Sequence, residues 1–109
     1  MYKVYLIKTQ DDITRYKIGY TKRSVEKRIK EFKTGNSNDF QIVSVFESNW
    51  GTKIEANLHV RFKSKNIGGE WFTLSEQEVV NFYTECQKLH DIFDLLSKNN
   101  TWVIDKGGI

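Results

Sequence analysis

The fold of this 109-residue chain is decided by two short runs, Val4-Tyr5-Leu6-Ile7 and Tyr16-Lys17-Ile18-Gly19-Tyr20-Thr21. Both runs are apolar and aromatic, and a polar break lies between them, which is the pattern of an antiparallel hairpin. Side chains alternate between the two faces of paired strands. A register that places Tyr5 opposite Lys17 also places Val4 opposite Ile18 and Leu6 opposite Tyr16. We therefore expect one apolar face for a core, with Tyr5 and Lys17 as neighbours on the other face.

The pairing of Tyr5 with Lys17 has two interpretations. A nearby ammonium group favours phenolate and lowers a tyrosine pKa that is otherwise about 10, which suits catalysis. Tyrosine and lysine are also frequent cross-strand neighbours on a half-solvated sheet, with no catalytic role. We expect the sheet to be partly open near Tyr5, with Gly19 leaving room for a large ligand to approach.

The composition indicates one folded domain. Hydrophobic residues make up 39% of the chain and aromatic residues 14%, which excludes a disordered polypeptide. The single cysteine, Cys86, cannot form an internal disulfide, and the first residues contain no long apolar segment. We therefore expect a cytoplasmic protein with no membrane association.

Positive charge is concentrated in the first third of the chain. Residues 1–35 contain ten Lys and Arg against four Asp and Glu, whereas residues 36–109 contain seven against ten. This asymmetry predicts one electropositive surface that could meet a polyanion such as nucleic acid, with Lys22, Arg23 and Lys27 as candidate contacts. Many small domains carry a basic patch without binding nucleic acid, and Lys27 and Lys30 could equally form a solvated helix face.

The remaining pattern predicts three helices and further extended segments. The expected elements are a helix over 24–33 with Val25, Ile29 and Phe32 on its apolar stripe, a central or near-central strand over 39–47, a helix over 52–63, a turn at Gly68-Gly69 followed by a short strand, and a closing helix over 75–98. The fold class is α+β, a small three-stranded antiparallel sheet flanked by helices, with a long C-terminal helix. Residues 1–98 form the single domain and 99–109 a tail.

Glu55 and His59 are four residues apart and project from the same flank of the second predicted helix. Thr52 and Glu55 also match a capping box, in which Glu55 would bond to the start of its own helix instead of facing a ligand. Spacing alone leaves both roles open. Cys86 and His90 lie on the apolar stripe of the closing helix, and we interpret both as packing residues.

Several motifs together resemble those of the GIY-YIG nuclease superfamily, in the branch common in phages and mobile elements. The resemblance extends from about Tyr2 to Leu74 and is carried by Val4-Tyr5, Lys17-Ile18-Gly19, Arg28, Glu55-x-x-Leu58-His59 and Glu70-Trp71-Phe72. It implies a small antiparallel sheet flanked by helices and a metal-dependent nuclease that cuts phosphodiester bonds in DNA, in a bacterial or phage-infected host cell.

The resemblance also implies roles for individual residues. Tyr5 would be the general base or would orient the attacking water, Lys17 would help Tyr5 lose its proton, and Arg28 would hold the scissile phosphate. Glu55 would be the one protein ligand of Mg²⁺, with Mn²⁺ as a substitute. Many relatives carry a histidine or tyrosine at the position of Phe32, so Tyr20 or His59 would have to supply that polar group.

These observations favour a metal-dependent DNA endonuclease with low intrinsic sequence specificity. The chain contains no recognisable DNA-reading module, so targeting would depend on DNA structure, on a homodimer or on a separate partner. The alternative is a catalytically weak or inactive module that binds nucleic acid or regulates on the same scaffold, which the Lys17 and Phe32 departures motivate. A protein-interaction domain is a third possibility.

Overall fold

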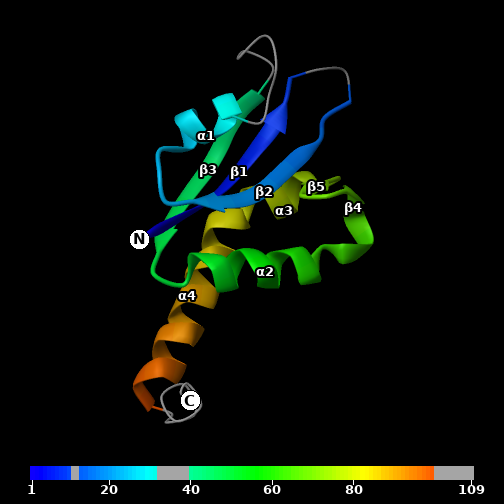
Figure 1. Ribbon diagram of the computed structural model, residues 1–109. Coiled ribbons are helices and arrows are strands. Elements are labelled where there is room, and N and C mark those ends of the chain that lie inside the picture. The colour runs from blue at the N-terminus through cyan, green and yellow to red at the C-terminus, as the bar shows by residue number, and fades with distance from the viewer. Residues whose placement is uncertain (11–12, 32–39, 100–109) are drawn as a thin grey trace.

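The computed structural model describes residues 1–10, 13–31 and 40–99. In this part of the chain a mixed α+β architecture forms around one antiparallel sheet (Figure 1). Helix α1 (Val25–Glu31) packs on one face of the sheet, and α2 (Gly51–Arg61) and α4 (Phe82–Asn99) pack on the other. The predicted α+β class is confirmed.

The sheet has five strands, in the order β3-β1-β2-β5-β4. Their bounds are β1 (Tyr2–Thr9), β2 (Tyr16–Thr21), β3 (Phe40–Ser48), β4 (Asn66–Gly68) and β5 (Trp71–Phe72). The prediction of three strands is wrong because the chain after α2 forms a second, tighter hairpin. Gly68 and Gly69 have φ values of +133° and +55°, a backbone conformation that other residues rarely adopt, and this turn lets two short strands pair beside β2.

β3 is an edge strand and not the central strand that its pattern predicted. Its apolar residues alternate to both sides because each face is covered by a helix. Phe46 packs into the core beneath α2 and α4, whereas Ile42 and Val45 pack with α1 on the opposite face. Cover on both faces was therefore the correct inference, and a central position was not required by it.

The β1–β2 hairpin pairs two residues away from the predicted register. Tyr5 lies opposite Gly19, and Lys17 lies opposite Ile7. The loop determines this register, because the Thr9 amide donates to the Arg15 carbonyl at 2.9 Å and the Arg15 amide donates to the Thr9 hydroxyl at 2.9 Å. A shift of two residues preserves the faces, so Tyr5 and Lys17 remain on one side of the sheet as diagonal neighbours.

The helices begin at side-chain caps in two of the predicted places. The hydroxyl of Ser24 accepts the Lys27 amide ahead of α1. Ser75 and Glu78 form a reciprocal capping box ahead of α3 (Glu76–Val80). The single closing helix predicted over 75–98 is instead two helices, α3 and α4, with Asn81 between them as the C-cap of α3. A 3₁₀ turn, η2 (Lys63–Lys65), follows α2.

Two apolar clusters fill the two faces of the sheet. The larger contains Val4, Leu6, Ile18, Phe46, Ile54, Leu58, Phe62, Phe72, Phe82, Cys86 and Leu89. The smaller contains Tyr5, Ile7, Val25 and Ile29. Cys86 is buried as predicted, and His90 accepts or donates a 2.7 Å hydrogen bond with buried Ser48, which ties α4 to the end of β3.

Phe32, which was predicted on the apolar stripe of the first helix, lies outside the described residues. So do residues 100–109 of the tail predicted over 99–109, whereas Asn99 is the last residue of α4. Among the helices of the described ranges, none is long and apolar enough to cross a membrane.

Candidate active site

Tyr5 is fully buried, in contrast to the open position predicted for it. Its ring crosses β2 at Gly19, where an added Cβ atom would lie 2.4 Å from the Tyr5 hydroxyl and 2.6 Å from Cζ. The expectation that Gly19 leaves room for a ligand is therefore wrong, because the phenol of Tyr5 occupies that space. Glycine is required here for close packing against Tyr5.

Burial raises the pKa of Tyr5, and the nearby carboxylates of Glu70 and Glu55 act in the same direction. The Arg28 guanidinium approaches the hydroxyl and opposes the rise. No atom of the described residues meets the geometry of a hydrogen bond to the hydroxyl. The predicted lowering of this pKa by Lys17 is thus wrong, because desolvation outweighs the positive charges nearby. Tyr5 is a neutral phenol at neutral pH in this arrangement.

Lys17 contacts two groups beside Tyr5. Its Nζ lies 3.0 Å from Glu70 Oε1 and 5.5 Å from the centre of the Trp71 ring. The Lys17 side chain is only 13% exposed, whereas the Glu70 side chain is 38% exposed, so water reaches this ion pair from the Glu70 side. Glu70 Oε1 also lies 3.0 Å from the position that a Gly19 Cβ atom would occupy. Glu70 therefore adjoins both Lys17 and the hydroxyl end of Tyr5.

Tyr5, Lys17, Arg28 and Glu70 form a cluster of polar side chains, which we call the cluster below. Glu55 faces the cluster and does not cap its own helix. The N-cap of α2 is Trp50, which places Thr52 inside the helix, and no side-chain cap is formed. Glu55 Oε2 instead lies 3.3 Å from His59 Nε2, and its side chain is 12% exposed. Burial raises the pKa of Glu55, the charge of His59 opposes the rise and that of Glu70 adds to it.

His59 anchors α2 to β2. Its Nε2 lies 2.8 Å from the Ile18 carbonyl, which can only accept, so this nitrogen carries the hydrogen. The ring also packs edge-on against Phe72, with 4.9 Å between ring centres. This geometry supports the interpretation that His59 positions the helix, and with it Glu55.

Residues from both sides of the sheet meet because β5 pairs with β2 only at Tyr16 and Lys17. At the next residue the Ile18 amide donates to the Glu70 carbonyl at 3.1 Å, and the Ile18 carbonyl lies 2.8 Å from His59 Nε2, so both backbone groups of Ile18 are paired. Beyond this point β2 extends past the end of β5, and we call Ile18 and Gly19 the β2 edge. Side chains of β1, β2 and α1 reach this edge from one face, and those of α2 reach it from the other.

The other candidate residues lie outside this cluster, although Arg23 shares the Glu31 carboxylate with Arg28. Tyr20 lies opposite Val4, on the other face of the sheet from Tyr5, and its ring contacts Tyr2 edge-on at 5.7 Å. Lys22 lies over the same Tyr2 ring at 4.9 Å. Arg23 is held by Glu31, with Nη1 2.5 Å from Oε2, and Lys27 is exposed. These three basic side chains remain predicted DNA contacts.

Glu70 is the site residue that the sequence reasoning missed. It was noted only as part of the motif Glu70-Trp71-Phe72, with no role assigned to it. Its sequence context offered one signal, namely an acidic residue between the glycine turn and two aromatic core residues. An acid in that position needs a cationic partner, and Lys17 provides it.

The donor atoms at this edge suit a hard divalent cation. Glu70 is close enough to Glu55 for its charge to add to the rise in the Glu55 pKa that burial causes, and a cation would relieve that repulsion. Within the described ranges no group of three metal-ligating side chains occurs. The protein therefore offers one or two carboxylates, which fits Mg²⁺ because this ion keeps several of its waters.

A comparison with protein families finds a match to the model described as the T5orf172 domain, over residues 2–87. No curated protein and no solved structure matches the chain. The family match corrects the assignment made from the sequence motifs. The matching family is the T5orf172 domain and not the GIY-YIG superfamily, so the motif resemblance did not identify the family.

Proposed function

The chain belongs to the T5orf172 domain family, which indicates a nuclease-like or DNA-binding function, and from that premise we propose a metal-dependent DNA endonuclease. The reaction is hydrolysis of a phosphodiester bond, with little sequence specificity of its own. The observation that carries the proposal is the meeting of Tyr5, Lys17, Arg28, Glu55 and Glu70 at the β2 edge.

The charges at this edge are complementary to a phosphodiester. Arg28 and Lys17 are two cations that can bind the phosphate oxygens, and a guanidinium can do so with two parallel hydrogen bonds. Both cations already have acidic neighbours, since Arg28 Nη1 lies 3.1 Å from Glu31 Oε1 and Lys17 is paired with Glu70. A phosphate group replaces part of these contacts when it binds.

Tyr5 serves as a neutral hydroxyl and not as a base. Because its pKa is raised, the phenol keeps its proton at neutral pH, and it can orient water by donating or accepting a hydrogen bond. The hydroxyl is covered in this arrangement, so it reaches the attacking water only after a neighbouring side chain moves. Glu70 is the candidate for that movement because its side chain is 38% exposed.

Glu55 is the proposed ligand of Mg²⁺ or Mn²⁺, with Glu70 as the nearest second carboxylate. The metal would supply Lewis-acid stabilisation of the charge that develops on the phosphate. His59 keeps the Glu55 carboxylate directed at the β2 edge through its bond to the Ile18 carbonyl.

The alternative function is binding of nucleic acid without efficient cleavage. One observation favours it, namely that the Tyr5 hydroxyl is inaccessible and lies beside the Lys17–Glu70 ion pair. If that ion pair persists when DNA is bound, the phosphate can contact the basic side chains without being hydrolysed.

Incubation with supercoiled plasmid, in Mg²⁺ or Mn²⁺ and then with chelator, tests the proposal. We expect metal-dependent nicking that is lost in Arg28→Ala and in Glu55→Ala. The matched controls are Arg61→Ala and Glu47→Ala. Arg61 pairs with Glu85 on α4, away from the β2 edge, and Glu47 is an exposed residue of β3.

Retarded DNA mobility without nicking in either metal would favour the binding module instead. The same assay on linear single-stranded and branched DNA identifies the preferred form. Size-exclusion chromatography with light scattering tests whether the active species is a homodimer. The candidate surface for a homodimer is α4, where Ile92 and Leu95 are 50% and 59% exposed.

A further inference from the structure

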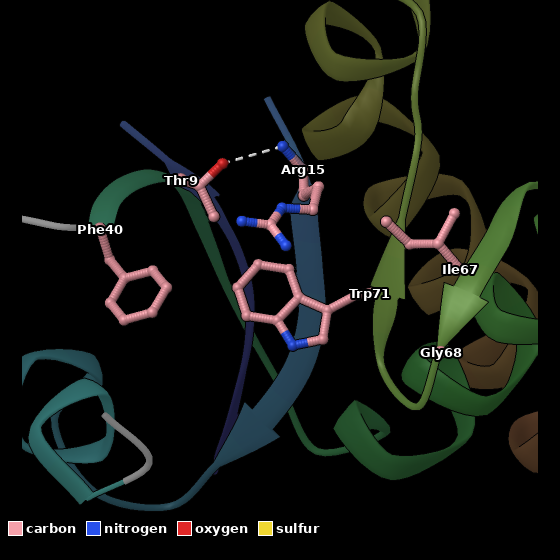
Figure 2. A pocket seen from close by; sticks show the side chains of 6 residues that line it. All are labelled: Thr9, Arg15, Phe40, Ile67, Gly68 and Trp71. Atoms are coloured by element: carbon pink, nitrogen blue, oxygen red, sulfur yellow. Dashed lines mark hydrogen bonds between the residues drawn. The ribbon is translucent and has the colours of Figure 1, made fainter. Parts of the chain in front are cut away.

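A pocket of about 360 Å³ lies next to the cluster, toward the β1–β2 loop (Figure 2). Its walls are formed by Thr9, Arg15, Phe40, Ile67, Gly68 and Trp71. This volume falls within the range of about 300–1,000 Å³ that is usual for small-molecule sites. The pocket has no role in the proposed hydrolysis.

The pocket opens on the same face of the sheet as Tyr5 and Lys17. Trp71 lies directly opposite Lys17 in the β2–β5 pairing, and Phe40 lies opposite Thr9 in the β1–β3 pairing. Residues opposite one another in a strand pair share a face. The Lys17 ammonium is 5.5 Å from the centre of the Trp71 ring, so Trp71 forms a shared boundary between the pocket and the cluster.

The lining has the chemistry of a nucleobase site. The rings of Phe40 and Trp71 are stacked, with 5.8 Å between centres and 30° between planes, and both rings line the pocket. Figure 2 shows the Arg15 guanidinium directed toward the Trp71 side of the pocket, with Gly68 on the β4 side adding no side chain. None of the six lining residues is acidic, so a polyanion meets no repulsion there.

We propose that this pocket stacks one unpaired base of a nucleic acid strand whose neighbouring phosphate lies at the Lys17 cluster. The inference rests on the proposed function, since it identifies the substrate as single-stranded or locally unpaired DNA. A base inside an intact duplex cannot reach a pocket walled by Trp71 and Phe40, whereas an unpaired base can stack on them.

Fluorescence anisotropy in the presence of EDTA measures binding separately from cleavage. The probes are labelled oligothymidylate of twelve residues and a duplex of the same length. Stacking on an aromatic side chain is worth about 1–3 kcal/mol per base, so Trp71→Leu is expected to weaken binding of the single strand roughly 5- to 150-fold. Trp71→Phe keeps an aromatic face and is expected to restore most of the affinity, and duplex binding should change little.

Two further variants protect the test against misfolding. Arg15 is exposed, so Arg15→Gln should fold normally. It is expected to weaken binding and to reduce the slope of log affinity against log salt concentration by the amount of about one phosphate contact. Trp50→Leu is the matched tryptophan control, because Trp50 packs against Phe93 away from the pocket, and it should not change the affinity. Thymidine monophosphate should compete far less well than the strand.

Single-strand affinity within twofold of the wild type in both Trp71→Leu and Arg15→Gln would overturn the inference, even if nicking is observed. Equal competition by the mononucleotide would also overturn it. Loss of affinity in these variants together with a complete absence of nicking would refute the proposed endonuclease and leave the base pocket supported.

Discussion

Gly19→Ala is expected to destabilise the fold because the space above Gly19 is filled by the Tyr5 ring. The new Cβ would lie 2.4 Å from the Tyr5 hydroxyl, against 3.4–4 Å for an ordinary contact, so the two groups overlap by about 1 Å. Tyr5 cannot move away easily, since it is fully buried between the sheet and α1. Overpacking of this kind costs roughly 1–3 kcal/mol.

For a domain of this size, that loss corresponds to a fall in Tm of roughly 5–15 °C. Urea unfolding followed by circular dichroism measures the free energy directly, with Tyr5→Leu as the second arm of a double-mutant cycle. Leucine removes the end of the ring that meets the new methyl group, so Gly19→Ala should cost much less in the Tyr5→Leu background. A cost below about 0.5 kcal/mol in the wild-type background, or equal costs in the two backgrounds, would refute the reasoning.

Three further predictions follow from buried or capping groups. Because the folded-state pKa of Glu55 is raised, the folded protein binds more protons than the unfolded chain between the two pKa values, and its stability falls as pH rises through that window. Glu55→Gln should therefore be more stable than the wild type in urea with chelator at pH 7, and a variant less stable than the wild type at pH 7 would contradict this. Ser75→Ala removes a reciprocal cap and should cost about 1 kcal/mol in urea unfolding, whereas exposed Ser64→Ala should be neutral. Burial raises the pKa of Cys86 to about 12, so a thiol reagent at pH 8 should react only as the protein unfolds, and rapid labelling of the native state would argue against a buried thiol.

The faces of the hairpin could be predicted from sequence, whereas its register could not. Alternation with a period of two assigns Tyr5 and Lys17 to one side of the sheet in any register that shifts by an even number of residues. The register itself depends on the hydrogen bonds between Thr9 and Arg15. These involve a loop whose geometry is not encoded in the hydrophobic pattern.

The orientation of Glu55 was undecidable from spacing because it depends on where the helix begins. Thr52 and Glu55 form a capping box only if Thr52 is the N-cap, but the N-cap is Trp50, two residues earlier, and α2 begins at Gly51. A Cβ atom at Gly51 would lie 2.2 Å from the Cβ of Tyr2, so the start of α2 packs closely against β1. That contact involves residues far apart in the sequence.

The burial of Tyr5 and the role of Glu70 were also beyond sequence reasoning. Both depend on tertiary packing, in which α1 covers Tyr5 and the β4–β5 turn brings Glu70 to Lys17. A local pattern gives the charge of a neighbour but not the desolvation that accompanies burial, and here desolvation determines the direction of the Tyr5 pKa shift.

The most direct measurement of the central claim is the rate of plasmid nicking in Mg²⁺ by the wild type, Arg28→Ala and Glu55→Ala, beside Arg61→Ala and Glu47→Ala. The account predicts nicking by the wild type and by both controls, and its loss in the two site variants and in chelator. Nicking by purified Arg28→Ala and Glu55→Ala at the wild-type rate would contradict it.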